Sequence, residues 1–119
     1  MKDSEIEIIN RMPPAQFKNF CFTFFESLGL TNIESAAVPE CGYVTGRGTI
    51  ELGILMTYHF VFLGTQHAGI VSEKAIQDLR DLMENKTNKG LILTTGSFSR
   101  QSKRQAKSKG KVPIDLFDR

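Results

Sequence analysis

Four basic residues near the carboxyl end of the chain have the spacing of one helical face. They are Arg100, Lys103, Arg104 and Lys107. Residues three or four apart are neighbours on a helix surface, where like charges repel by roughly 0.2–0.5 kcal/mol per pair. A phosphate backbone would offset that repulsion. The spacing predicts a face that binds a polyanion, and a helix whose charged face is simply solvated is an equally open alternative.

Charge is distributed unevenly along the 119 residues, although the net charge is only +2. Residues 1–84 contain six Lys/Arg and eleven Asp/Glu, whereas residues 85–114 contain eight Lys/Arg and no acidic residue. A basic stretch of this kind is typical of a surface that contacts nucleic acid. Ser97 begins the predicted basic helix, and the free N–H groups of a helix amino terminus attract anions. The alternative is a set of lysines that only keep the protein soluble.

Two other kinds of site are not supported. The glycines at positions 42, 46 and 48 precede a predicted strand rather than a helix, and no Gly-Lys-Ser/Thr follows them, so a phosphate-binding loop does not fit. His59 and His67 have no Cys or His partner at a metal-ligand spacing. No nucleophile-elbow motif accompanies them either.

Length and composition predict one globular domain, residues 1–119, with a core built from 40% hydrophobic residues. Cys21 and Cys41 are interpreted as reduced thiols rather than a disulfide framework. No apolar stretch follows the amino terminus, and the apolar run over residues 53–64 is too short and too polar to span a bilayer. We therefore expect a cytoplasmic protein with no membrane partner.

Hydrophobic spacing predicts helices and strands in alternation. Helices are predicted from Pro13 to Leu28, from Ser72 to about residue 84, and from Ser97 onwards. Strands are predicted over residues 33–38, 49–56, 58–63, 90–95 and 112–117, with a loop over 39–48 and a short helix or an arm over 1–11. The order helix, three strands, helix, strand, helix, strand predicts an α/β fold with a mixed β-sheet flanked by helices.

Several short motifs occur in a recognisable order. They cover residues 14–20, 28–30, 46–51, 63–67 and 89–99. The most specific is the last, in which a Lys-Gly-Leu-Ile-Leu-Thr-Thr strand leads to a Phe-Ser turn at residues 98–99, and Ile114-Asp-Leu116 fits a closing strand. Together these motifs resemble the Mrr-type catalytic domain of the PD-(D/E)xK nuclease superfamily, from Met12 to Asp118. The resemblance implies a restriction-endonuclease-like fold.

The resemblance also implies a reaction, the Mg²⁺-dependent hydrolysis of DNA. Two carboxylates hold the metal, which polarises the phosphate and activates water, and a neighbouring lysine stabilises the developing charge. Lys18 stands where an acidic residue is expected, and Glu51 where an aspartate is expected. Leu63 replaces a glutamine and Thr65 replaces the catalytic lysine. Glu51 is therefore only a weak metal candidate, and Glu40 and Lys74 are the residues that could substitute for the lost groups.

These observations predict a nuclease-fold protein that binds DNA through Ser97 and the four basic residues of the last helix. Mg²⁺-dependent cleavage is expected to be weak or lost, and no cofactor is expected unless the site is active, in which case it is Mg²⁺. One alternative is an active endonuclease with a rearranged site. The other is a protein-interaction or scaffold subunit, whose partner is a second copy of the chain or an active nuclease subunit.

Overall fold

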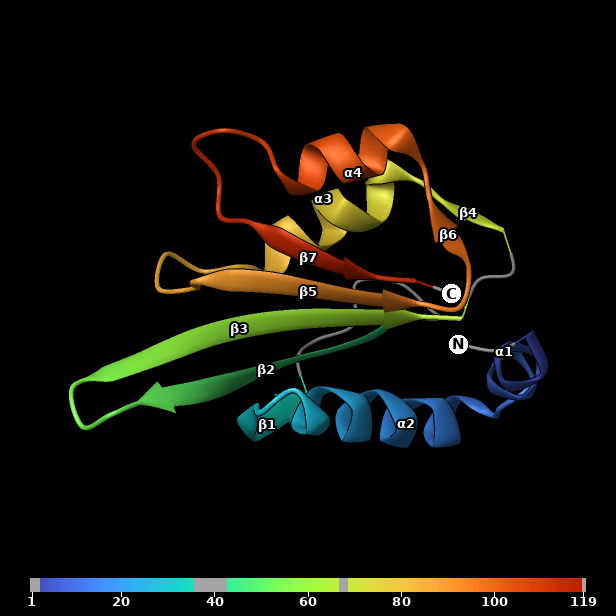
Figure 1. Cartoon of the computed structure of the whole chain (residues 1–119), viewed down its shortest axis with the longest axis horizontal. Helices are drawn as coiled ribbons and strands as arrows, with labels where there is room; N and C mark the ends of the chain where they lie inside the picture. Colours follow the sequence, from blue (N-terminus) through green and yellow to red (C-terminus); the bar gives the residue numbers. More distant parts are fainter. Residues whose placement is uncertain (1–2, 36–42, 67–68, 119) are drawn as a thin grey trace.

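The computed structural model describes residues 3–35, 43–66 and 69–118 (Figure 1). Two helices open the chain, α1 (Asp3–Asn10) and α2 (Pro14–Ser27). Pro14 occupies the first turn of α2, where its missing N–H has no partner to lose. Phe17, Cys21 and Phe25 share the buried face of α2.

Five strands form the main sheet, in the spatial order β1-β2-β3-β5-β7. They are β1 (Thr31–Ser35), β2 (Tyr43–Leu52), β3 (Met56–Thr65), β5 (Lys89–Thr94) and β7 (Ile114–Phe117). The first three run antiparallel to one another, and β3, β5 and β7 are parallel. Two short strands, β4 (Ile70–Val71) and β6 (Ser97–Phe98), form a separate parallel pair that the sequence did not predict.

Parallel neighbours need crossover connections, and α3 (Glu73–Leu82) and α4 (Arg100–Ala106) provide them. Both helices cover one face of the sheet, and α2 covers the other (Figure 1). Two apolar clusters follow this division: Ile76, Leu79 and Ile92 belong to the α3 and α4 side, and Phe25 and Phe62 to the α2 side. The expected α/β fold, a mixed sheet flanked by helices, is confirmed.

The β2–β3 hairpin differs from the expectation in its register. The sequence predicted strands over residues 49–56 and 58–63, with a loop before them. In the structure the turn is formed by residues 53–55 and begins at Gly53, which has φ +75°, and the ladder runs from Tyr43 opposite Thr65 to Leu52 opposite Met56. The glycines at 46 and 48 therefore lie within β2 and not in a loop.

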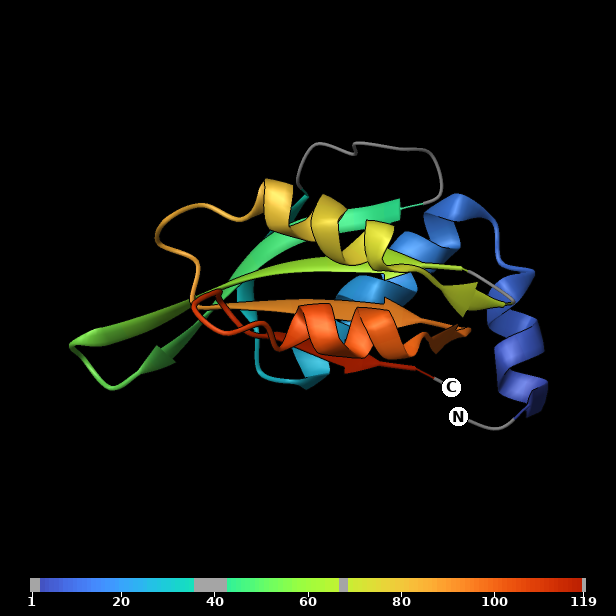
Figure 2. The same cartoon turned by 90° about the horizontal axis from the view of Figure 1, so that it is seen from above.

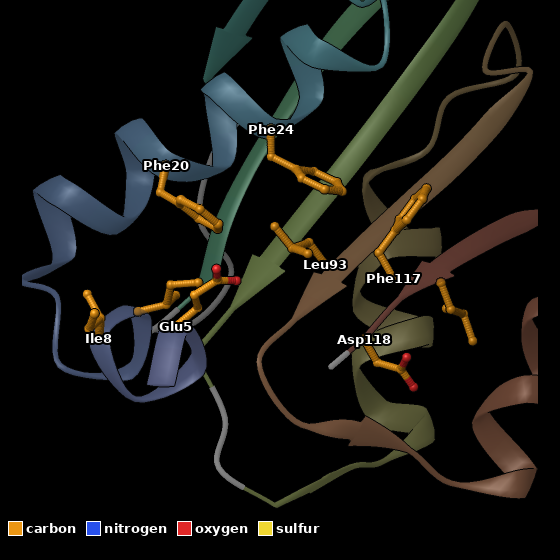
Figure 3. A pocket seen from close by; sticks show the side chains of 9 residues that line it. Glu5, Ile8, Phe20, Phe24, Leu93, Phe117 and Asp118 are labelled. Atoms are coloured by element: carbon orange, nitrogen blue, oxygen red, sulfur yellow. The ribbon is translucent and has the colours of Figure 1, made fainter. Parts of the chain in front are cut away.

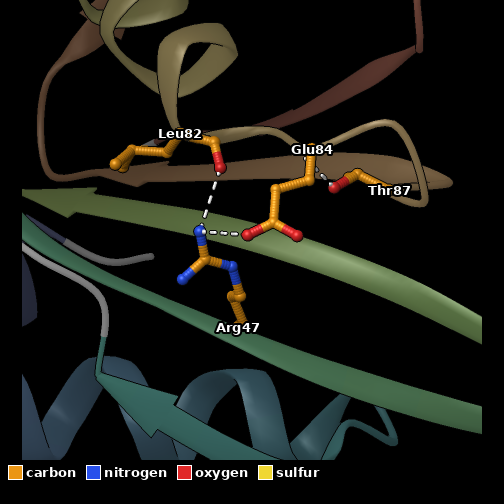
Figure 4. Close-up of polar contacts among 4 residues, drawn as sticks. All are labelled: Arg47, Leu82, Glu84 and Thr87. Atoms are coloured by element: carbon orange, nitrogen blue, oxygen red, sulfur yellow. Dashed lines mark hydrogen bonds and ion pairs between the residues drawn. The ribbon is translucent and has the colours of Figure 1, made fainter.

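These strand glycines are required by close packing. A Cβ atom on Gly46 would lie 2.5 Å from the carbonyl oxygen of Glu34 on β1. Between the two glycines, Arg47 connects β2 to the segment after α3. Its Nη2 atom lies 3.3 Å from Oε1 of Glu84 and donates to the carbonyl oxygen of Leu82 at 3.2 Å (Figure 4). The glycine-rich stretch thus has a structural explanation, in agreement with the argument against a phosphate-binding loop.

No helix within the described ranges is both long enough and apolar enough to span a membrane.

Candidate nucleic-acid interface and degenerate nuclease site

The carboxyl end of β3 carries two of the positions that the resemblance singled out. Leu63 lies opposite Thr45, and Thr65 lies opposite Tyr43, so these four side chains share the face of the sheet that α3 covers. Leu63 is completely buried and packs in the apolar cluster with residues of α3. An aliphatic side chain in this position has no group that could bind a metal ion or move a proton.

Thr65 lines a small cavity of about 170 Å³ at the start of α3. Tyr43, Ser72 and Lys74 also line it. Lys74 therefore shares a cavity with Thr65, as expected of a residue that could replace the lost lysine. Its ammonium group also lies 3.1 Å from Oδ2 of Asp78, one turn further along α3.

The donors around this cavity do not fit Mg²⁺. Magnesium prefers carboxylate and other oxygen ligands in octahedral geometry, and the described lining residues include hydroxyls and an ammonium group but no carboxylate. Nowhere in the described ranges do three residues of the types His, Cys, Asp and Glu gather in a way that could hold a metal ion. Glu40, Cys41 and His67 lie outside the described residues.

The structure separates Glu51 from Thr65, and this corrects the expectation that they share a pocket. Glu51 lies opposite Thr57, at the tip of the hairpin, whereas Thr65 lies opposite Tyr43 at its base. Thr65 is eight positions beyond Thr57, which at about 3.3 Å per residue corresponds to roughly 26 Å. Glu51 is also exposed. The β2 residues that do face Leu63 and Thr65 are Thr45 and Tyr43, and neither can replace a carboxylate.

Lys18 is also remote from that cavity. It is exposed on α2, on the opposite side of the sheet from α3, and its Nζ atom lies 5.6 Å from the centre of the Phe22 ring (Figure 1). Between Leu63 and Thr65, the residue that faces α2 is Gly64, whose missing Cβ would lie 2.5 Å from Sγ of Cys21. The two side chains that the sequence placed together, Lys18 and Glu51, thus lie in different parts of the fold.

The four basic residues of the last helix are brought together as predicted. Arg100, Lys103 and Arg104 lie on α4 and Lys107 is its C-cap; all four are exposed, and none has an ion-pair partner among the described residues. The opposite face of α4 is anchored: Ser102 and Ala106 are fully buried, and Ser102 Oγ donates to the carbonyl oxygen of Val71 at 3.0 Å. The helix therefore presents its charges outward.

Arg80 fixes the carboxyl end of α4. Its two terminal nitrogens donate to the carbonyl oxygens of Gln105, at 2.7 Å, and Val112, at 2.9 Å. Burial lowers the pKa of this guanidinium group, but arginine remains charged across the physiological range. A cation at the carboxyl end of a helix is favoured by the helix dipole. Arg80 is therefore a structural cation, unlike the exposed ones on α4.

The amino ends of α3 and α4 lie side by side. β4 and β6 pair in parallel, with Ile70 opposite Ser97, and each strand leads directly into its helix (Figure 2). Ser72 and Ser99 cap the two helices. The expectation that Ser97 begins the last helix is therefore wrong, because Ser97 lies in β6 and pairs with β4. The backbone N–H of Ser97 donates a hydrogen bond to the carbonyl oxygen of Gly69. This arrangement brings Ser97 and Arg100 to the same end of the molecule as the cavity that Thr65 lines.

A larger cavity, of about 700 Å³, lies on the α2 side of the sheet (Figure 3). Its walls are mostly apolar, including Phe20, Phe24, Leu93 and Phe117, with Glu5 and Asp118 as acidic residues. None of the residues that the sequence singled out for DNA binding or catalysis lines this cavity. The cavity lies on the opposite face of the sheet from Leu63 and Thr65, so it is separate from both candidate sites.

Sequence reasoning missed Tyr43, Thr45 and Ser72 as neighbours of Thr65. The aromatic and β-branched run Tyr43-Val44-Thr45, which favours a strand, was the available signal. It was hidden by Gly46 and Gly48, which suggested a loop. As a result, the carboxylate expected to lie beside Thr65 was assigned to Glu51, which is close to the hairpin turn, and not to the part of β2 that pairs with Thr65.

Comparisons with known proteins agree with this fold. A family model described as Mrr_cat, restriction endonuclease, matches residues 9–119. A solved structure titled DNA modification-dependent restriction endonuclease AspBHI is similar, with a TM-score of 0.63 and 20% sequence identity over 94% of this chain. The match covers 31% of that structure's chain, so this chain corresponds to about a third of it. The search of curated proteins gave no significant match. The chain belongs to the Mrr_cat restriction endonuclease family.

Proposed function

We propose that this chain binds duplex DNA through the exposed basic face of α4 and cleaves DNA weakly or not at all. The observation that carries the binding proposal is the set of four cations on and beside α4, exposed and without acidic partners among the described residues. Such a surface gains counterion-release free energy when it meets phosphates. A DNA partner also agrees with a cytoplasmic location.

The position of α4 supports the same proposal. Its amino end lies beside the start of α3 and the cavity lined by Thr65. DNA that contacts α4 would therefore pass near the place where related endonucleases carry out cleavage. The similar solved structure is titled a DNA modification-dependent endonuclease, and we extend DNA as a partner to this chain by analogy.

The loss of cleavage is inferred from the groups around Thr65. Phosphodiester hydrolysis of this family's type needs a metal ion to activate water and a cation to stabilise the developing charge. Tyr43, Thr45, Leu63 and Thr65 supply no metal ligand of the carboxylate type, and Glu51 lies at the other end of the hairpin. We therefore assign no metal-dependent step to these residues.

An active endonuclease with a rearranged site is the second candidate, and one observation favours it. Lys74 lines the same cavity as Thr65 and is the only cation among the described lining residues. Efficient cutting of DNA that is lost in Lys74→Met but retained in Lys18→Met would support this candidate over the first.

The salt dependence of DNA binding tests the proposal. We expect the logarithm of the association constant to fall linearly with the logarithm of salt concentration. In Arg104→Gln/Lys107→Gln, the slope should decrease by about two, because roughly one unit is lost per phosphate contact. The loss should be similar for unrelated DNA sequences. Fluorescence anisotropy with labelled duplexes measures both quantities.

A control double variant removes the same number of positive charges from a different part of the surface. Arg11 and Lys18 are exposed and lie outside α4, after α1 and on α2, so Arg11→Gln/Lys18→Gln should leave the slope nearly unchanged. Equal losses in the two pairs would mean that only net charge matters, and α4 would not be the binding surface. A wild-type chain that shows no DNA binding at low salt contradicts the proposal outright.

A further inference from the structure

The tip of the β2–β3 hairpin projects beyond the body of the molecule in both views (Figures 1 and 2). Its side chains are unusually apolar for so exposed a position. Ile54 is 101% exposed, Leu55 94%, Met56 53%, Leu52 48% and Tyr58 39%. We call these five residues the hairpin tip. Contiguous apolar surface of this kind marks interaction sites in soluble proteins.

The hairpin tip continues an apolar face that α2 covers only in part. Leu52 pairs with Met56, and Ile50 pairs with Tyr58, so these four side chains share one face of the hairpin. Ile50 packs against the α2-side cluster, close to Gly29 at the end of α2. Beyond that point the helix has ended, and the face is uncovered among the described residues.

The backbone edges at the tip are open as well. β1 pairs with β2 between Gly46 and Thr49, and β5 pairs with β3 only from Phe60 onwards. Met56, Thr57 and Tyr58 therefore have ladder partners only across the hairpin. Natural proteins usually protect such edges with lysine, proline or a bulge, whereas residues 48–60 contain no Lys, Arg or Pro.

We propose that the hairpin tip is a self-association surface, which pairs with the hairpin tip of a second copy of this chain around a two-fold axis. The absence of Lys and Arg over residues 48–60 argues against DNA as the occupant, because phosphate contacts need cations. A neutral apolar surface is instead complementary to itself, and two-fold dimers are the commonest assemblies. The charged side chain of Glu51 lies on the other face of the hairpin, since it alternates with Ile50 and Leu52.

The available area is sufficient for a dimer. The hairpin tip carries roughly 600 Å² of accessible surface, so two copies could remove about 1,200 Å² from water, above the roughly 1,000 Å² expected of a specific interface. This value is an upper one, because it takes all the exposed surface of the five residues as buried; open strand edges would add main-chain hydrogen bonds.

Sedimentation equilibrium of the full chain tests the proposal. We expect wild type to approach twice its monomer mass of 13.3 kDa as concentration rises through the micromolar range. Ile54→Asp should raise the dimer dissociation constant by about thirty-fold or more, because it places a charge at the centre of the contact. Ile8→Asp is the matched control, since Ile8 is 63% exposed on α1, and it should dimerise like wild type.

A mixing experiment checks the two-fold arrangement. Ile54→Asp and Ile54→Lys should each be monomeric alone, and an equimolar mixture should recover the dimer, because opposite charges then meet across the axis. A wild-type chain that stays monomeric overturns the proposal, as does a dimer that survives Ile54→Asp or a mixture that remains monomeric. If the wild type is monomeric and Ile54→Asp binds DNA more weakly than the wild type does, the hairpin tip contacts DNA and the proposal is wrong. Thermal unfolding by circular dichroism verifies that each variant is folded.

Discussion

Thr65 illustrates how a single side chain changes what a site can do. The resemblance places a lysine here, and lysine contributes a positive charge that can stabilise a developing anion. Thr65 has a neutral hydroxyl group and is only 8% exposed. Its neighbour across the ladder, Tyr43, is also neutral. The one cation at this cavity belongs to a different element, α3, and lies within ion-pair distance of Asp78.

Cys21 provides a prediction for a buried titratable group. Burial raises the pKa of its thiol from 9.0 to about 12. Below the ordinary thiol pKa both folded and unfolded chains keep the proton, so folding carries no cost. As pH rises from about 9 towards 12, the unfolded chain loses the proton and the folded chain retains it. Stability should therefore fall by up to about 1.4 kcal/mol per pH unit in this window.

Urea unfolding at a series of alkaline pH values measures this effect. Other groups titrate in the same range, so the comparison is with Cys21→Ala, whose stability should decline less steeply with pH. The variant loses some packing at every pH, and only the difference in slope is informative. Identical slopes for the two proteins would show that the Cys21 thiol ionises as readily in the folded chain as in the unfolded one.

At the scale of the elements, patterns of apolar residues predicted most of the fold. The faces of α2 and α3 followed from helical spacing, and β5 followed from a short apolar run; both helix faces and the strand are buried in the structure. The register of the β2–β3 hairpin did not follow. Gly46 and Gly48 have a turn-like composition, and their actual role, close approach to β1, depends on tertiary contacts that no local pattern reveals.

The candidate site was predicted only in the parts that are local in sequence. The four cations of α4 depend on residues within one helix, and the structure has them exposed there; their role in DNA binding stays a prediction. The partners of Thr65 depend on strand register, so an error of several residues moved the proposed carboxylate from the base of the hairpin to its tip. Side-chain identity alone could not have corrected this, because Glu51 and Thr65 are each compatible with several registers.

Gly64 couples α2 to β3, and this contact gives a prediction at the same scale. A Cβ atom on Gly64 would lie 2.5 Å from Sγ of Cys21 and 3.7 Å from Phe17. Gly64→Ala should destabilise the fold by about 1–3 kcal/mol through overpacking. In the Cys21→Ala background the sulfur is absent, so the same substitution should cost less than half as much.

Chemical denaturation of the four proteins of this double-mutant cycle gives the coupling free energy. Equal costs of Gly64→Ala with and without the Cys21 sulfur would mean that the contact with α2 does not limit this position. The destabilisation by Gly64→Ala would then come from contacts of β3 other than the one with the Cys21 sulfur.

At the scale of the whole molecule, the basic stretch of the sequence forms one continuous part of the fold. The acid-free stretch over residues 85–114 forms β5, β6, α4 and the loop to β7. The α4 helix, with its exposed cations, covers the same face of the sheet as α3, and the β2–β3 hairpin projects from one end of the molecule (Figure 1). DNA binding and self-association would therefore use different surfaces, and a dimer could present two copies of α4.

The most direct test of the central claim, DNA binding without efficient cleavage, is incubation of the chain with supercoiled plasmid in Mg²⁺ and, separately, in Mn²⁺. Half of each sample is run on a native gel, and half is stripped of protein first. The account predicts a mobility shift that Arg104→Gln/Lys107→Gln weakens, and plasmid that is still supercoiled after stripping. Nicked or linear plasmid that forms at many turnovers per chain, and only with added metal, would contradict it.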